Sequence, residues 1–204
     1  MADNKNKAIA QGKTDPPEES DGRRRRRVAS RRAIVEAMMA LIEQGVMEPT
    51  AAQVSKQANV GMRTVFRHFN DMESLFAETT DVLTERVREY FLYVSPEKHI
   101  DARLRDVINA RAQMFQILAN FKLSTQTWFH KSAYLREDDL NTRKMLHNNL
   151  KKNFPEMQDM DVARTKALDL ALGFDGWLGN RVGGGLSVEE TKDVIYALAR
   201  PQFD

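Results

Sequence analysis

The sequence predicts an all-α protein of about nine helices. Apolar residues recur at intervals of three and four along most of the 204-residue chain, whereas no segment shows the strict alternation of a half-buried strand. Residues that cap helix N-termini stand ahead of several of these apolar stripes. Glycine or proline often follows a stripe and ends it. These three observations predict the fold class before any motif is considered.

The first amphipathic stripe lies between residues 34 and 42. Its apolar residues recur at i, i+3, i+4, i+7 and i+8, which is the pattern of a helix that buries one face. Gly45 follows the stripe and ends the helix. The stripe consists of Ile34, Ala37, Met38, Leu41 and Ile42.

Two short helices joined by a tight turn are predicted between Thr50 and Phe69. Thr50 is a good N-cap, because its hydroxyl can accept a hydrogen bond from an otherwise unpaired amide of the first helical turn. Asn59 tolerates the left-handed conformation that such a turn requires, and Gly61 can cap the second helix. Small or β-branched residues occupy the helix crossing, and polar residues stay outside it. The crossing residues are Val54, Ala58, Val60 and Val65, and the outer residues are Gln53, Lys56, Gln57, Arg63 and Arg67.

A fourth helix follows this pair. Asp71 can cap its N-terminus, and Glu73 lies in its first turn, where a negative charge is favourable. Its apolar face comprises Leu75, Phe76, Val82, Leu83, Val87, Tyr90 and Phe91.

Helices continue from residue 95 to the C-terminus. Apolar residues between 104 and 118 mark a fifth helix, and residues 120–134 and 140–154 suggest two more before Pro155 interrupts the pattern. Residues 162–180 have an apolar face broad enough to pack on both sides. Three glycines at 183–185 break the chain, and Ser187 with Glu190 forms a capping box for the final helix.

Positive charge is concentrated near the N-terminus. The whole chain has a formal net charge of +2, yet residues 23–70 contain ten Lys or Arg and only three Asp or Glu, a net +7. This distribution favours a nucleic-acid partner. The unbroken run Arg23–Arg27 could follow DNA phosphates or enter a minor groove, and it could equally be a solvated basic tail that binds nothing in particular. Residues 1–22 contain almost no large apolar groups, and we expect them to be a disordered tail.

Residues 31–76 resemble the DNA-binding domain of the TetR family of bacterial transcriptional repressors. The family pattern has Thr, Ile-Ala, Ala-Gly-Val-Ser, Thr-Leu-Tyr, His-Phe, Lys-Glu and Leu in order. Three departures are present: Phe66 replaces a tyrosine that commonly reaches a phosphate, Met72 replaces a lysine, and Ser55 and Asn59 replace alanine and glycine. The first two should reduce phosphate contacts and give a shallower salt dependence. The pattern appears here as Thr50, Val54-Ser55, Ala58-Asn59-Val60-Gly61, Thr64-Val65-Phe66, His68-Phe69, Met72-Glu73 and Leu75.

The resemblance implies a division of the chain and a function. Residues 23–75 would form a three-helix, helix-turn-helix domain with its motif at 50–69, and residues 76–204 a helical domain for effector binding and dimerisation. The last two long helices would pair with those of a second subunit. The chain would then be a homodimeric repressor that binds a palindromic, double-stranded DNA operator and is released by a small apolar effector. The alternative is a protein-interaction adaptor that retains the helix-turn-helix as a scaffold.

Candidate DNA contacts follow from the same residues. Arg63 is the best candidate to read guanine through its forked guanidinium, and Thr64 could contact a thymine methyl group or a phosphate. His68 is expected to cap or pack at the end of the recognition helix, where it could touch a phosphate; a metal role is not expected because no second ligand lies at helical spacing. The full set is Arg27, Thr50, Ala51, Gly61, Met62, Arg63, Thr64, Phe66, Arg67 and His68.

Candidate effector contacts are aromatic. Aromatic residues at helical spacing can line a ligand cavity, although they more often fill a core. Of the candidates, Trp128 and Trp177 are the strongest, and His130, Arg111 and Asn180 could orient a polar group. The five aromatic candidates are Phe115, Phe121, Trp128, Phe174 and Trp177.

Several classes of function are not expected. The sequence has no Gly-rich phosphate loop, nucleophile elbow or His-Glu metal helix, so we expect neither an enzyme nor a cofactor. The absence of cysteine excludes disulfides and thiolate metal sites. No apolar run is long enough for a membrane span and no signal-peptide core is present, so we expect a cytoplasmic bacterial protein, nucleoid-associated when bound to DNA.

Overall fold

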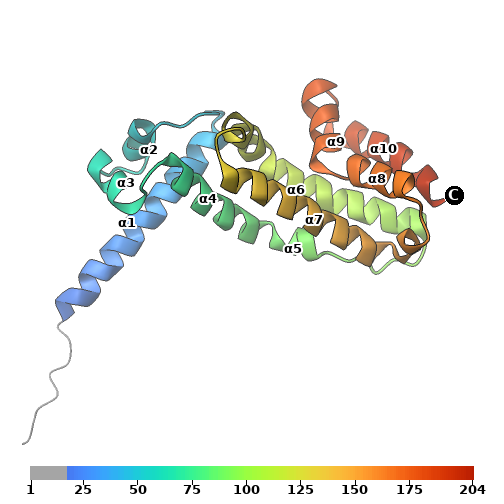
Figure 1. The fold of residues 1–204 in the computed structure, drawn as a ribbon, viewed down its shortest axis with the longest axis horizontal. Coiled ribbons are helices and arrows are strands. Elements are labelled where there is room, and N and C mark those ends of the chain that lie inside the picture. Colours follow the sequence, from blue (N-terminus) through green and yellow to red (C-terminus); the bar gives the residue numbers. More distant parts are fainter. Residues whose placement is uncertain (1–17) are drawn as a thin grey trace, which may run out of the picture.

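The computed structural model describes the backbone of residues 18–204 and the side chains from Asp21 onward. This part of the chain is all-α, with ten α-helices and three short additional helices. Figure 1 shows an elongated molecule in which α1–α3 lie at one end and α8–α10 at the other, joined by the long helices between them. The predicted fold class is confirmed.

Helix α1 (Glu18–Glu43) begins earlier than we predicted. Residues 18–22, which we expected to belong to a disordered tail, are helical, and the Arg23–Arg27 run lies inside the helix rather than before it. The remainder of the predicted tail, residues 1–17, lies outside the described residues. Arginine is a good helix former, and an i,i+4 ion pair of 2.6 Å between Arg25 and Asp21 supports the first turns. In Figure 1 this end of α1 projects beyond the other helices.

The two short helices form as the sequence predicted. Helix α2 (Ala51–Gln57) starts at Thr50, whose side chain accepts a hydrogen bond from the Gln53 amide, and the Gln53 side chain accepts one in return from the Thr50 amide. Asn59 has φ = 52°, the left-handed turn conformation that we expected. Gly61 then precedes helix α3 (Met62–His68) in an extended conformation.

The predicted fourth helix is divided in two. Helix α4 (Met72–Arg86) is capped by Asp71, which accepts a 2.8 Å hydrogen bond from the Ser74 amide, as the sequence predicted. Val87 leaves the helical conformation, and α5 (Arg88–Leu92) carries the rest of the apolar face.

Helices α6 (Ile100–Trp128) and α7 (Ala133–Asn153) are the longest of the C-terminal half. Our prediction of a break near residue 119 and a separate helix over 120–134 was wrong, because α6 continues without interruption to Trp128. The segment Leu118–Lys122 contains no glycine or proline that would end a helix. Ser132 instead caps α7, where its hydroxyl accepts a hydrogen bond from the Leu135 amide.

The predicted helix over 162–180 is also broken. Helix α8 (Val162–Ala171) ends before Gly173, and α9 (Phe174–Leu178) starts after it. A Cβ atom at Gly173 would lie 2.5 Å from the Asp169 carbonyl oxygen, so only glycine allows the chain to turn so tightly here. Helix α10 (Val188–Ala199) has the predicted capping box of Ser187 and Glu190. The short helices are η1 (Pro155–Gln158), η2 (Gly179–Gly183) and η3 (Arg200–Phe203).

One buried arginine holds the C-terminal helices together. Arg111 of α6 donates a 2.5 Å hydrogen bond to the Leu172 carbonyl, at the end of α8, and a 2.7 Å hydrogen bond to the Leu146 carbonyl of α7. Burial lowers the pKa of Arg111 to about 9. The side chain therefore joins three helices at the point where α8 breaks.

No helix within residues 18–204 is long and apolar enough to span a membrane. No group of three or more His, Asp or Glu residues in this range is placed to hold a metal ion.

Candidate DNA-binding surface and effector cavity

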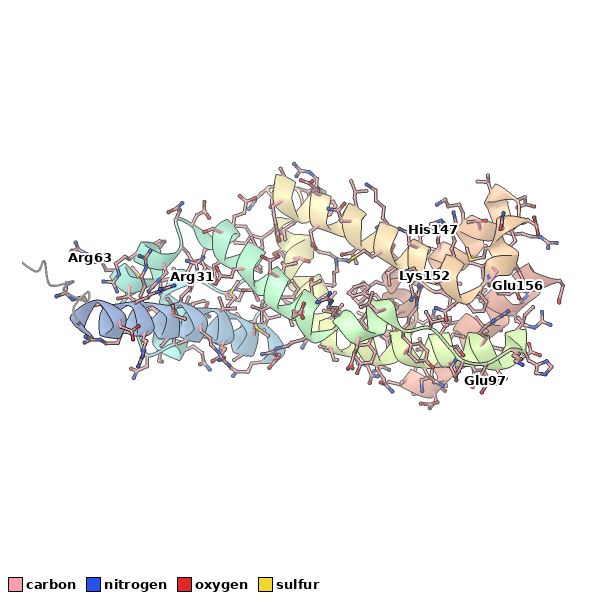
Figure 2. All side chains as sticks on the ribbon, turned by 90° about the horizontal axis from the view of Figure 1, so that it is seen from below. Arg31, Arg63, Glu97, His147, Lys152 and Glu156 are labelled. Carbon is pink, nitrogen blue, oxygen red and sulfur yellow. The ribbon has the colours of Figure 1, made fainter. Side chains whose placement is uncertain are left out.

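Helix α3 presents a basic face to solvent. Arg63 and Arg67 are exposed one turn apart. Their neighbours Met62 and Phe66 are also exposed, whereas Val65 packs inward at 1% exposure. Figure 2 shows Arg63 at the outer edge of the molecule, far from His147 in the C-terminal half. The chain therefore offers two guanidinium groups to a partner without any rearrangement of α3.

Arg31 of α1 holds the end of α3 in place. Its guanidinium pairs with both carboxylate oxygens of Glu78 on α4 and donates a 2.6 Å hydrogen bond to the carbonyl oxygen of His68. The same group lies 4.4 Å from the ring centroid of Phe69. One side chain thus links α1, α4 and the last turn of α3. The sequence suggested only that Arg31 belonged to a basic segment, because its partners are 37 and 47 residues away.

His68 does not share the exposed face of α3. Its side chain is 8% exposed, and neither ring nitrogen has a hydrogen-bond partner among the described residues. The sequence predicted that this side chain would cap or pack at the end of the recognition helix, and it packs inward there beside Arg31, which takes it away from the face that we expected to touch a phosphate. Burial, followed by the charges of Arg67, Arg31 and Arg27, lowers the pKa of His68. Both effects favour the neutral form of the imidazole.

The other predicted DNA contacts lie around α3. Thr50 is exposed at the start of α2, Ala51 and Thr64 are half-buried, and Gly61 is exposed with no atom within 4 Å of an added Cβ. Arg27 is exposed on α1 and close enough to His68 to influence its pKa. All predicted contacts except His68 therefore have side chains or backbone accessible to a partner.

Four exposed arginines of α1 differ in whether they form an ion pair within the helix. Arg25 pairs with Asp21 and Arg32 pairs with Glu36, so these two charges are partly neutralised within the helix. Arg24 and Arg27 are exposed and have no ion pair among the described residues. Arg27 lies one turn before Arg31 on the same helical face, which is the face directed toward α3.

A cavity of about 820 Å³ lies between α6, α7 and the α8–α9 break. This volume lies within the range of small-molecule sites in proteins. Helices α6, α7, α8 and α9 and the α6–α7 turn all contribute to its wall. The apolar part of the wall consists of Phe121, Phe129, Leu135, Leu140, Leu146, Leu170 and Phe174.

Two of the five predicted aromatic contacts line this cavity, namely Phe121 and Phe174. The other three fill the core. Phe115 packs against Phe174 and Trp177 with ring centroids 5.4 and 6.2 Å apart, and Trp128 packs 5.5 Å from Phe76. Helical periodicity shows that an aromatic side chain faces inward, but it does not show whether the space in front of it is filled.

Of the predicted polar contacts, His130 and Arg111 line the cavity and Asn180 does not. Asn180 instead donates a hydrogen bond to the Gly176 carbonyl. No pattern in the sequence predicted the charged wall contributed by α7, where Asp139 and Arg143 lie one helical turn apart and Asp138 precedes them. An amphipathic pattern assigns such residues to a solvated face, and only the position of α8 and α9 opposite them encloses the space.

The α6–α7 turn connects the cavity to α4. Phe129 and His130 of this turn line the cavity, and Ser132 donates a 2.5 Å hydrogen bond to Glu73 in the first turn of α4. In the first turn of α7, the Tyr134 hydroxyl lies 3.3 Å from Asp81 of α4. Two sets of contacts therefore connect the cavity wall to the basic helix α3. The first is the Ser132–Glu73 hydrogen bond between the α6–α7 turn and α4, and the second is the contact of Arg31 with Glu78 of α4 and with the end of α3.

Comparison with known proteins agrees with this geometry. The sequence profile described as bacterial regulatory proteins, tetR family, matches residues 33–79. The HTH-type transcriptional regulator BetI of Escherichia coli (strain K12) is 24% identical over 163 residues, which cover 76% of this chain and 83% of that protein.

Solved structures show the same fold. A transcriptional regulator from Rhodococcus sp. Rha1 superposes with a TM-score of 0.61 at 15% identity, covering 85% of this chain and 93% of that one. A TetR family transcription regulator from Marinobacter aquaeolei VT8 gives a TM-score of 0.59 at 17% identity, covering 86% and 97%. Residues 33–79 therefore match the DNA-binding domain of the tetR family of bacterial regulatory proteins, and α2 and α3 form the helix-turn-helix of that domain.

Proposed function

We propose that the chain is a ligand-responsive repressor that binds a palindromic operator as a homodimer and releases it when a small molecule enters the cavity. The observation that carries this proposal is the pair of unobstructed guanidinium groups, Arg63 and Arg67, on the exposed face of α3. In this division of the chain, residues 23–75 bind DNA and residues 76–204 bind the effector and the second subunit. Because α1 starts at Glu18, we also assign the helical turn before residue 23 to the DNA-binding domain.

We assign different roles to the two arginines. Arg63 lies in the first turn of α3, the end of a recognition helix that reaches the base edges, and its fork can bind guanine O6 and N7. Arg67 lies in the last turn and Arg27 on the neighbouring face of α1, so both are suited to phosphates. Thr50, Ala51, Gly61, Met62, Thr64 and Phe66 border this surface and complete the proposed interface.

A second subunit is needed for specific binding, because one seven-residue recognition helix contacts few base pairs. Two symmetric helices spaced by roughly 34 Å would enter successive major grooves. The helices at the far end of the molecule expose the apolar side chains that such a pairing would bury. Val162 and Leu170 of α8 are 77% and 62% exposed, and Leu198 of α10 is 54% exposed.

The effector would act through the turn between α6 and α7. A molecule in contact with Phe129 displaces a turn that also carries the Ser132–Glu73 hydrogen bond to α4. A shift of α4 moves Glu78, which is paired with Arg31, and therefore moves the tethered end of α3. The effector needs only a higher affinity for the shifted conformation than for the DNA-bound one.

A gel-shift titration with the DNA upstream of the chain's own coding sequence tests this proposal. The expected result is a complex that weakens steeply with salt and is competed poorly by random duplex. Binding that is absent or insensitive to salt would instead support the adaptor, in which the exposed Met62 and Phe66 contact a protein.

A further inference from the structure

The charged residues of the cavity are mostly paired with one another. Lys122 lies 3.4 Å from Asp139, and Arg143 bridges Asp139 and Asp175 at 2.7 and 2.6 Å. At the other end of the cavity, His147 and Lys166 both bind Asp169, at 2.8 and 2.9 Å. These pairs leave little charge available for a ligand.

Asp138 differs from the other carboxylates of the wall. It lines the cavity and is half-buried, and within residues 18–204 its carboxylate has neither a hydrogen bond nor an ion pair. Three charged side chains lie close enough to influence its pKa. Lys122 of α6 is the positive one and is already bound to Asp139, whereas Asp139 of α7 and Asp81 of α4 are negative.

The environment of Asp138 favours an added positive charge. Burial raises the pKa of Asp138, and the charges of Asp139 and Asp81 raise it further, while Lys122 opposes them. An unpaired carboxylate withdrawn from water is costly, and a cation from outside would relieve that cost. Phe121 and Phe129 line the same cavity, and the faces of aromatic rings also attract cations.

The positive residues of the wall do not offer an equivalent site for an anion. Arg111 is buried, and both of its terminal nitrogens already donate to the carbonyls of Leu172 and Leu146. Its Nε has no hydrogen-bond partner among the described residues, but the nearby negative charge of Asp169 already offsets the charge of the guanidinium. Lys144 and His130 line the cavity, but both side chains are exposed and already in contact with water. Among the described residues of the wall, Asp138 is thus the carboxylate best placed to fix the charge of a ligand.

We propose that the cavity binds an organic cation with an apolar or aromatic body, and that the carboxylate of Asp138 pairs with its positive charge. This inference rests on the proposed function, since it names the chemical class of the effector. The apolar wall would hold the body of the molecule, and Asp138 would select its charge. The proposal changes the expected effector from a small apolar molecule to a cation with an apolar body.

Probes matched in shape and opposite in charge test the proposal. We would titrate the full chain calorimetrically with tetraphenylphosphonium and with tetraphenylborate, which have nearly the same size, and then with the flexible pair decylammonium and decanoate. The proposal predicts that in at least one pair the cation binds about tenfold more tightly than its anion, the difference that about 1.4 kcal/mol of charge pairing gives. Equal binding of the two members, or tighter binding of the anion, in both pairs would overturn it.

Substitutions at Asp138 test whether this residue causes the preference for the cation. Asp138→Asn should weaken binding of the cation about tenfold and leave the anion unchanged or slightly tighter, whereas Asp138→Glu should keep a preference for the cation. Glu137→Gln is the matched control, because it removes the same charge from an exposed residue of α7 that does not line the cavity. It should change the cation affinity by no more than about twofold. A loss as large in Glu137→Gln as in Asp138→Asn would overturn the role of Asp138. Should Asp138→Asn fail to fold, the charge preference of the unmodified chain and of Asp138→Glu still decides the proposal.

DNA binding of the same preparations separates the two proposals. If the chain binds DNA but none of the four probes enters the cavity, the effector class proposed here is wrong and the DNA-binding function stands. If the cations bind with the predicted preference but the chain does not bind DNA, the site stands and the proposed regulatory function is wrong.

Discussion

The Ser132 hydroxyl donates a 2.5 Å hydrogen bond to the carboxylate of Glu73, although the two residues are 59 positions apart in the chain. The same hydroxyl accepts a hydrogen bond from the Leu135 amide and so caps α7. One oxygen therefore fixes both the start of a cavity-lining helix and the first turn of α4. This hydrogen bond is a direct connection between the start of a cavity-lining helix and the DNA-binding domain.

Replacement of Ser132 by alanine should separate ligand binding from DNA release. Loss of the cap lowers the free energy of unfolding by about 1 kcal/mol. The affinity of a bound cation should change little, because Ser132 does not line the cavity. The factor by which that cation weakens DNA binding should shrink severalfold, as measured by anisotropy of labelled operator with and without the cation.

Ser187→Ala is the control for that experiment. Ser187 caps α10 in the same way but has no contact with α4 among those that the structure describes. It should lose similar stability and keep the full response to the cation. If the two variants respond alike, the Ser132–Glu73 connection does not transmit the signal.

Replacement of Arg31 by alanine should weaken DNA binding without removing a DNA contact. Its partners are protein atoms, Glu78 and the His68 carbonyl, so its loss frees the end of α3. The Arg31 and Glu78 side chains are 42% and 29% exposed, and the pair therefore contributes only about 1 kcal/mol to stability. Urea unfolding and DNA titrations over a salt series measure both effects.

The salt series also distinguishes the role of Arg31. Its replacement should leave the slope of log affinity against log salt unchanged, whereas loss of a phosphate contact lowers the slope by about one. Arg32→Ala, which breaks the exposed pair with Glu36, should affect neither stability nor affinity appreciably. A reduced slope in Arg31→Ala would make Arg31 a direct phosphate contact.

Arg63→Ala should cost about 1 to 3 kcal/mol of binding to the preferred site and relax the preference at one base position. Arg67→Ala should instead weaken binding to all sequences and reduce the salt slope. Competition binding with single-base operator variants provides the measurement. Lys152→Ala, which removes an exposed charge from α7 and lies outside the cavity wall and outside α8–α10, serves as the control. Uniform weakening in Arg63→Ala would reassign that residue to a phosphate.

The stability of the protein should fall on acidification because of His68. Burial and the nearby arginines hold its pKa below the ordinary value of 6.5 in the folded chain. Between that value and the lowered one, the unfolded chain binds a proton that the folded chain does not, so stability decreases as pH falls through this window. Thermal unfolding between pH 7 and pH 5 should show a shallower decline for His68→Gln. An identical decline in both proteins would contradict this assignment.

Replacement of Leu198 by glutamate should produce monomers and weaken operator binding. The exposed Leu198 lies on α10, and a charge there would have to be desolvated if α10 pairs with a second subunit. Sedimentation velocity gives the oligomeric state. Val94→Glu alters an equally exposed apolar residue outside α8–α10 and should remain dimeric. A Leu198→Glu chain that still sediments as a dimer would place the interface elsewhere.

The sequence predicted those features that depend on neighbouring residues. Thr50, Asn59 and Asp71 act within a few positions of themselves, so the boundaries of α2, α3 and α4 followed from local chemistry. The burial of His68 depends on Arg31, which lies 37 residues away and contacts the same turn of α3. The isolation of Asp138 likewise depends on Lys122 of another helix binding Asp139 instead. These contacts join residues that are far apart in the chain, so no periodic pattern in the sequence predicts them.

Selection of binding sites from a pool of random duplexes tests the central claim most directly. If α3 of a symmetric dimer reads DNA, the purified chain should enrich a palindromic sequence whose half-site centres are about one helical turn, or a multiple of it, apart. A guanine position in each half-site should lose its enrichment with Arg63→Ala. Recovery of no preferred sequence, or of a sequence that Arg63→Ala selects equally well, would contradict the assignment of α3 as a reading helix.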